Sequence, residues 1–148
     1  MSQSLAKVYV HIIFSIRSGS PVIKGAVKYE LHSFIKGVLL KFGSDLNEIS
    51  SNPDHIHILC TLPRTISISE LISKIKVPSS KLLKNIGLKD FCWQDGYGVF
   101  SVSSSKVLIV EQFIRNQPEL HRSQSFKDEL RIFFKEYGVE YNEQYVWD

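Results

Sequence analysis

A tight turn between two strand-like segments constrains the fold of this chain more than any other feature. Leu46 to Ser50 and His55 to Leu62 are predicted strands, and Asn52-Pro53-Asp54 lies between them. Asn, Pro and Asp are typical turn residues, and a connection this short pairs two strands as an antiparallel hairpin. We therefore expect an antiparallel sheet that contains this hairpin.

The segments before the hairpin predict a strand followed by a helix. Val8 to Ile16 is rich in β-branched and aromatic residues, which favours a buried strand. In Tyr29 to Phe42 the apolar residues recur at steps of three and four, which indicates one helix face, and Gly43 suits a helix end. The apolar residues of this face are Leu31, Phe34, Ile35, Val38, Leu39 and Phe42.

After the hairpin, a proline divides the next helical region. Ser67-Ile68-Ser69-Glu70 has the serine and glutamate of a capping box, so we expect a helix to begin there. We expect Pro78 to end this helix, and Ser79 or Ser80 to cap a second short helix that runs to about Asn85.

The remaining segments complete an α+β pattern. Val99 to Ser103 alternates apolar and polar residues like a half-buried strand, and a helix then runs to about Asn116, where Pro118 stops it. Ser125-Phe126-Lys127-Asp128 resembles another capping box, for a helix that Gly138 closes. This order of elements predicts an α+β fold of the ferredoxin-like type, with helices packed on one face of an antiparallel sheet.

The composition is that of one soluble globular domain. The chain has 148 residues, 43% of them hydrophobic, and no repeat or linker, so we expect a single domain over residues 1–148. A net charge of +3 is weak support for a polyanionic partner. Cys60 and Cys92 lie far apart and form no CxxC motif, so no disulfide framework or zinc site is indicated. Without a signal peptide or membrane-spanning segment, we expect a cytoplasmic location.

Two histidines in the second hairpin strand are candidate metal ligands. His55 and His57 lie two residues apart, so their side chains point to the same face of the sheet. Gln117 could add an amide oxygen for a hard ion such as Mg²⁺ or Mn²⁺, and Phe113 lies four residues earlier on the same helix face. The alternative for the histidines is a half-exposed strand whose outward positions carry histidine by chance. The alternative for Gln117 is that it only ends a helix.

A basic stretch is a candidate DNA-backbone surface. Ammonium and hydroxyl groups are common phosphate contacts. The alternative is a solvated face of two short helices. The residues concerned are Lys74, Lys76, Ser79, Ser80, Lys81 and Lys84.

Five segments follow one another along the chain: NPDHIHILCTLP, KVPSSKLLK, FCWQDGYGVFSVS, FIRNQPELHRSQSF and YGVEYNEQYVWD. Taken together they resemble the successive blocks of the single-tyrosine transposases of the HUH nuclease superfamily. This group includes insertion-sequence-200-like and repetitive-palindrome-associated transposases. The resemblance runs from about Val8 to the C-terminus.

The resemblance implies a metal-dependent reaction on single-stranded DNA. In this family the two histidines, here His55 and His57, bind Mg²⁺ or Mn²⁺ with the glutamine of a Tyr-x-x-x-Gln helix, here Gln117. The tyrosine attacks the scissile phosphate, leaving a 5′-phosphotyrosine link and a free 3′-hydroxyl. The resemblance also implies recognition of DNA hairpins and a homodimer in which the tyrosine helix of one subunit completes the site of the other.

The chain departs from the family at the nucleophile, because Phe113 stands where the family has tyrosine. Phenylalanine has no hydroxyl and cannot form a phosphotyrosine bond, so the sequence predicts a protein that binds hairpin DNA but does not cleave it. One alternative is an introduced substitution of a natural tyrosine, and a second is a nucleophile elsewhere. A third is a domesticated regulator that only binds DNA hairpins. The other tyrosines considered are Tyr97, Tyr137, Tyr141 and Tyr145.

Overall fold

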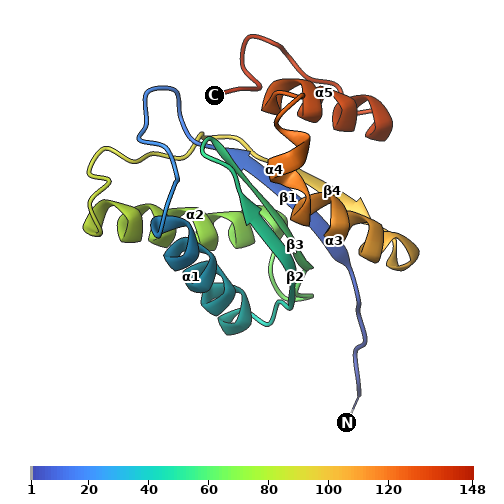
Figure 1. Cartoon of the computed structure of the whole chain (residues 1–148). Coiled ribbons are helices and arrows are strands. Elements are labelled where there is room, and N and C mark those ends of the chain that lie inside the picture. Colours follow the sequence, from blue (N-terminus) through green and yellow to red (C-terminus); the bar gives the residue numbers. More distant parts are fainter. Residues whose placement is uncertain (1) are drawn as a thin grey trace.

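A computed structural model describes residues 2–148 and contains a four-stranded antiparallel sheet with the strand order β2-β3-β1-β4 (Figure 1). The predicted hairpin is present as β2 and β3, and β1 lies between β3 and β4. The strands are β1 (Tyr9–Ser15), β2 (Leu46–Ser51), β3 (His55–Thr61) and β4 (Gly98–Val102).

Helices α1 (Val27–Lys41) and α2 (Ile68–Asn85) cover one face of the sheet. Alternate strand residues, among them Phe14 and Ile58, point to this face and form the main core with the two helices. The order strand, helix, strand, strand, helix, strand confirms the predicted α+β fold of the ferredoxin-like type.

The segments after β4 cover the opposite face of the sheet, which the sequence analysis did not foresee. Ile13 packs against Leu130, and Leu59 packs against Ile114. Because side chains alternate along a strand, residues 11, 55 and 57 also point to this second face. The segments are η1 (Ser104–Lys106), α3 (Val107–Arg115), α4 (Gln117–Leu120) and α5 (Phe126–Tyr137).

The prediction that Pro78 ends a helix is wrong, because α2 continues through it to Asn85. An internal proline removes one backbone hydrogen bond and costs about 3 kcal/mol. The buried stripe of α2 continues past Pro78 to Ser79 and Leu83, and its packing against the sheet offsets that cost. Ser79 therefore lies inside the helix and caps nothing.

The sequence alone correctly places two glycines at helix ends. Gly43 follows α1 with φ +80°, and Gly138 closes α5 with φ +62°, both in the left-handed region that side chains disfavour. The start of α5 is capped as predicted, because the Ser125 hydroxyl accepts a hydrogen bond from the Asp128 amide at 3.2 Å.

Both cysteines are free, in agreement with the absence of a CxxC motif. Burial raises the pKa of Cys60 to about 11, so this thiol stays protonated at neutral pH. None of the helices within residues 2–148 has the length and apolar character needed to cross a membrane.

His32 on α1 is expected to make the fold sensitive to acid. Its Nε2 atom contacts the Ser51 hydroxyl at 2.7 Å. Burial, and next the charge of Lys28, lower its pKa from 6.5 to about 4. The unfolded chain therefore takes up this proton at higher pH than the folded one, and His32 lowers stability as the pH falls from about 6.5 to 4.

This expectation is checked by urea unfolding at a series of pH values. His32→Gln should flatten the loss of stability over this range relative to the wild type. An unchanged pH profile in His32→Gln would contradict the assignment.

Candidate metal centre and nucleic-acid surface

The structure brings the predicted pair His55 and His57 together with two residues that the sequence analysis missed. His121 follows α4, and Glu129 lies on the inner side of α5. One nitrogen or oxygen atom from each of these four residues lies within 4.8 Å of the others, and we call the group the histidine cluster. Three of its members are buried and His121 is nearly so.

The donor atoms of the histidine cluster converge on the Glu129 carboxylate. The two Glu129 oxygens lie 2.7 Å from Nε2 of His57 and 2.7 Å from Nε2 of His121. All four atoms are buried, and within the described residues none of them has a hydrogen-bond partner beyond these ion-pair contacts. Buried polar atoms are normally satisfied, and four that face one another fit a shared cation.

The other ring nitrogens fix the orientation of two of these histidines. Nδ1 of His121 lies 2.7 Å from the backbone carbonyl of Gln124, and Nδ1 of His55 lies 2.6 Å from the Asp54 carboxylate. A carbonyl only accepts, so Nδ1 of His121 carries the proton and Nε2 keeps a free lone pair in the neutral ring. This arrangement is typical of metal-binding histidines.

His57 is held in the same way by a fourth histidine, which lies outside the cluster. Its Nδ1 lies 2.8 Å from Nε2 of His11 on the neighbouring strand β1. Burial, and next the charge of His57, lower the pKa of His11 well below 6.5. A neutral His11 accepts the Nδ1 proton of His57, which leaves Nε2 of His57 directed at Glu129.

The charges in the histidine cluster suit a cation. Burial lowers the pKa of His57, although its contact with Glu129 opposes this, so the ring is neutral at pH 7. Burial raises the pKa of Glu129, but the contact with His57 and the nearby histidines outweigh it, so its carboxyl is ionised. Neutral imidazole and ionised carboxylate are the forms that bind metals. Three nitrogens and one carboxylate favour Mn²⁺ or another transition ion over Mg²⁺.

Gln117, the predicted third ligand, lies beside the histidine cluster. It begins α4 instead of ending α3, and it is fully buried. Its Oε1 accepts a hydrogen bond of 3.2 Å from Asn52, whose amide also lies 3.1 Å from Nε2 of His55. Gln117 therefore contacts the histidine cluster through Asn52.

The sequence held one signal for Glu129. It lies three residues after Phe126 and four before Phe133, on the apolar face of the predicted last helix. A carboxylate on an apolar face is exceptional and indicates a buried partner. For His121 the spacing alone gave no comparable signal.

Phe113 lies next to the histidine cluster of its own chain. Its ring centroid is 5.7 Å from that of His57 and 6.1 Å from that of His11. Helix α3 holds the ring there, because Ile114 packs against Leu59. Of the other tyrosines, Tyr137 is the one that shares a cavity with Phe113, but its hydroxyl donates to the Ser101 carbonyl at 2.7 Å.

The predicted basic stretch is only partly available to DNA. Lys76 donates to the carbonyls of residues 94, 95 and 96 at 2.8, 3.3 and 2.6 Å, and burial lowers its pKa to about 8. Ser79 is fully buried and accepts a hydrogen bond from Trp93 at 3.0 Å. Ser80 is partly buried, and the exposed cations of the stretch are Lys74, Lys81 and Lys84.

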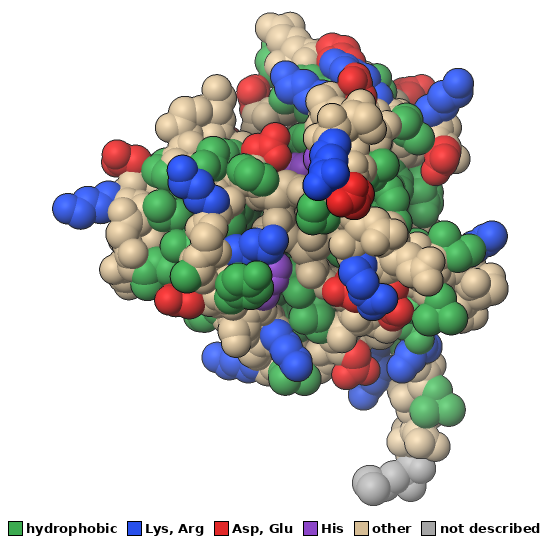
Figure 2. All heavy atoms as spheres, viewed as in Figure 1, with side chains coloured by type: hydrophobic (Ala, Val, Ile, Leu, Met, Phe, Trp, Pro, Cys, Tyr) green, Lys and Arg blue, Asp and Glu red, His purple; other side chains and the backbone are tan. Residues whose placement is uncertain are grey.

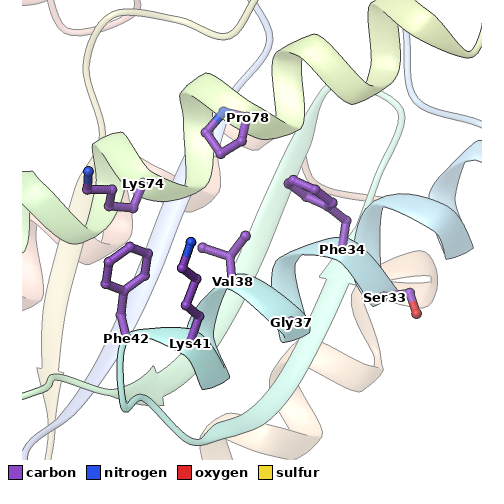
Figure 3. A pocket seen from close by; sticks show the side chains of 8 residues that line it. All are labelled: Ser33, Phe34, Gly37, Val38, Lys41, Phe42, Lys74 and Pro78. Atoms are coloured by element: carbon purple, nitrogen blue, oxygen red, sulfur yellow. The ribbon is translucent and has the colours of Figure 1, made fainter.

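A groove between α1 and α2 combines cations with aromatic rings (Figure 3). It has a volume of about 490 Å³, and the ammonium groups of Lys41 and Lys74 lie 5.8 and 5.7 Å from the Phe42 ring. Together α1 and α2 carry seven lysines against two glutamates. The groove is lined by Ser33, Phe34, Gly37, Val38, Lys41, Phe42, Lys74 and Pro78.

This groove and the histidine cluster lie on opposite faces of the sheet. Figure 2 shows Lys and Arg side chains beside hydrophobic ones where Figure 1 places α1 and α2, whereas little of any histidine reaches the surface in that view. The predicted DNA surface and the predicted metal ligands are therefore two separate sites.

The comparisons with known proteins agree with the fold and with the resemblance seen in the sequence. The family described as "Transposase IS200 like" matches residues 4–117. A putative transposase from Deinococcus radiodurans R1 has a TM-score of 0.62 and 20% identity, covering 79% of this chain and 98% of its own. A REP-associated tyrosine transposase bound to a REP hairpin has a TM-score of 0.61 and 20% identity, covering 82% and 74%. No curated protein matches the chain.

The matched region ends at Gln117. It therefore includes His55, His57 and position 113, whereas His121 and Glu129 lie beyond it.

Proposed function

This chain belongs to the IS200-like transposase family, and we propose that it binds hairpin-forming single-stranded DNA and holds a divalent metal beside the strand. The observation that carries the proposal is the buried histidine cluster next to the family's nucleophile position. The similar structure that holds a REP hairpin supports the choice of DNA.

The metal would be held by Nε2 of His57 and His121, a ring nitrogen of His55 and the carboxylate of Glu129. When bound, Mn²⁺ or Mg²⁺ would polarise a phosphate and stabilise charge on the leaving oxygen. The protein's own groups keep the site ready for the ion. His11 keeps His57 in the required tautomer, and Glu129 supplies the negative charge that a cation needs.

The chain as it stands lacks the nucleophile for strand cleavage. In the family reaction the tyrosine oxygen bonds to phosphorus, the bond from phosphorus to the 3′ oxygen breaks, and that oxygen gains a proton to become a hydroxyl. Phe113 has no oxygen to make this bond. This residue favours a second function, in which the protein binds DNA hairpins as a regulator without cutting them.

We assign hairpin binding to the exposed cations of α1 and α2. Neutralised phosphates release counterions, so the logarithm of the affinity falls with the logarithm of salt concentration by about 0.7 per contact on single strands. Replacing Lys74, Lys81 and Lys84 by alanine should therefore reduce this slope by about two. Fluorescence anisotropy with a labelled hairpin over a range of salt concentrations measures it.

The matched control replaces Lys7, Lys24 and Lys89, three exposed lysines outside these helices, which removes the same charge. An equal change of slope in both triple variants would show that only net charge matters. An unchanged slope in the first variant would place the DNA surface elsewhere.

The homodimer implied by the resemblance stays a prediction, and sedimentation with and without hairpin DNA tests it. Because Phe113 lies beside the histidine cluster of its own chain, the proposed site needs no helix from a partner.

A further inference from the structure

A cavity of about 250 Å³ opens between α3 and α5, directly beside the histidine cluster. His11, Phe113 and Glu129 line it, so the cavity and the histidine cluster are continuous. Its other walls are Val102, Ile109, Val110, Gln124, Ile132, Phe133, Glu136 and Tyr137.

Aromatic rings fix the shape of this cavity. Phe133 stacks on Phe100 with centroids 5.3 Å apart and meets His11 edge to face, also at 5.3 Å. The Tyr137 hydroxyl is bonded to the Ser101 carbonyl, so its ring is held in place. Rigid aromatic walls favour a flat, unsaturated guest, because little conformational freedom is lost on binding.

The charged groups that line the cavity are acidic. The lining residues, all within the described part of the chain, include no lysine or arginine, so a phosphate is disfavoured inside. The Glu129 carboxylate faces His57 and His121, whereas the exposed Glu136 contributes a carboxylate that accepts hydrogen bonds when ionised. Within residues 2–148, Glu136 has no hydrogen bond or ion pair to another side chain. The ligand that matches these walls and carboxylates is a flat ring that carries amino hydrogens.

We propose that this cavity, here called the base cavity, receives one unpaired base of the DNA strand that carries an exocyclic amine, such as cytosine or adenine. Their exocyclic amines donate to carboxylates such as that of Glu136, and thymine has no such amine. The neighbouring phosphates stay outside, next to the histidine cluster. This inference rests on the proposed function, because single-stranded DNA must first reach that cluster.

A second copy of this chain fits the base cavity less well. Two lining residues, Ile109 and Ile132, are 60% and 47% exposed, as in many protein interfaces. An apolar helix face placed over them would bury Glu136 without a hydrogen-bond donor, which is costly. A base with an amine satisfies both the aromatic walls and the carboxylate.

The test uses single strands of oligo-thymidine in which one central base is replaced by cytosine, adenine or an abasic residue. Because a homopolymer can shift its register, the single different base can find the base cavity. Wild-type protein should bind the cytosine and adenine strands about fivefold more tightly than the all-thymine strand. The abasic strand should bind no more tightly than the all-thymine strand.

Two variants separate the base cavity from the rest of the protein. Glu136→Gln keeps the shape but removes the charge, and should reduce the preference to less than about twofold. Val110→Phe should fill the cavity and abolish the preference. Glu140→Gln, an exposed glutamate outside the cavity, is the matched control and should bind like the wild type.

Equal binding of all four strands by the wild type would overturn the base cavity. If hairpin binding persists, the proposed function survives that result, whereas loss of all DNA binding would overturn both. A Val110→Phe variant that changes the oligomeric state in sedimentation but leaves the base preference intact would assign this surface to a second copy instead.

Discussion

Replacing Phe113 by tyrosine is expected to turn a protein that forms no covalent link with DNA into one that does. A labelled single strand with a hairpin is incubated with Mn²⁺ and then separated on a denaturing gel. The unmodified protein should leave no label on the protein band, and Phe113→Tyr should produce a labelled band.

The expectation follows from the position of the ring. Phe113 lies beside His57 and also lines the base cavity, so a hydroxyl on this ring has open space next to the histidine cluster. The ring is only half-buried, and adding one oxygen should change the free energy of unfolding by less than about 1 kcal/mol. The effect should therefore appear in the chemistry and not in stability.

Two controls define the result. Phe133→Tyr adds a hydroxyl to another ring of the same cavity and should give no adduct, because this ring lies on α5 and not at the proposed nucleophile position on α3. Phe113→Tyr combined with His57→Ala should also give none, because the metal centre is lost. Thermal unfolding shows whether each variant is folded.

Other outcomes have specific meanings. An adduct with the unmodified protein would identify a different nucleophile, and Tyr137 is the first to replace because it lines the same cavity. No adduct from Phe113→Tyr, with hairpin and metal binding intact, would favour the regulator.

Much of the fold could be predicted because it depends on local patterns. The short turn at Asn52-Pro53-Asp54 and the apolar face of α1 each specify one element. The continuation of α2 through Pro78 could not be predicted, because it depends on packing against a sheet formed by distant segments. Nor does the position of α3 to α5 on the second face follow from local pattern.

The candidate site also has one part that follows from local sequence patterns and one part that does not. His55 and His57 share a strand face, so their proximity follows from the period of a strand. Their contacts with His121 and Glu129 join β3 to residues more than sixty positions later, and no spacing rule reveals these. The sequence pattern instead predicted Gln117 as the third metal ligand, and Gln117 lies just outside the histidine cluster, hydrogen-bonded to Asn52.

The metal centre gives the second large expected effect. Wild-type protein should bind Mn²⁺ more tightly than Mg²⁺, because imidazole nitrogens suit transition ions and Mg²⁺ prefers oxygen ligands. His57→Ala and His121→Ala should each weaken Mn²⁺ binding by at least about a hundredfold. His11→Ala, which removes the partner of Nδ1 of His57, should weaken it by about ten- to a hundredfold. Isothermal titration calorimetry measures each affinity.

The same series decides between the ligands predicted from the sequence and those found in the structure. If Gln117 is a ligand, Gln117→Ala should weaken Mn²⁺ binding as much as His121→Ala does. If Gln117 acts only through Asn52, Gln117→Ala should weaken Mn²⁺ binding by less than about tenfold. His32→Ala is the matched control, because this histidine lies on the other face of the sheet and should have no effect. Equal Mn²⁺ affinity in the wild type and in a variant lacking both His55 and His57 would rule out the metal centre, because the remaining His121 and Glu129 cannot by themselves enclose an ion.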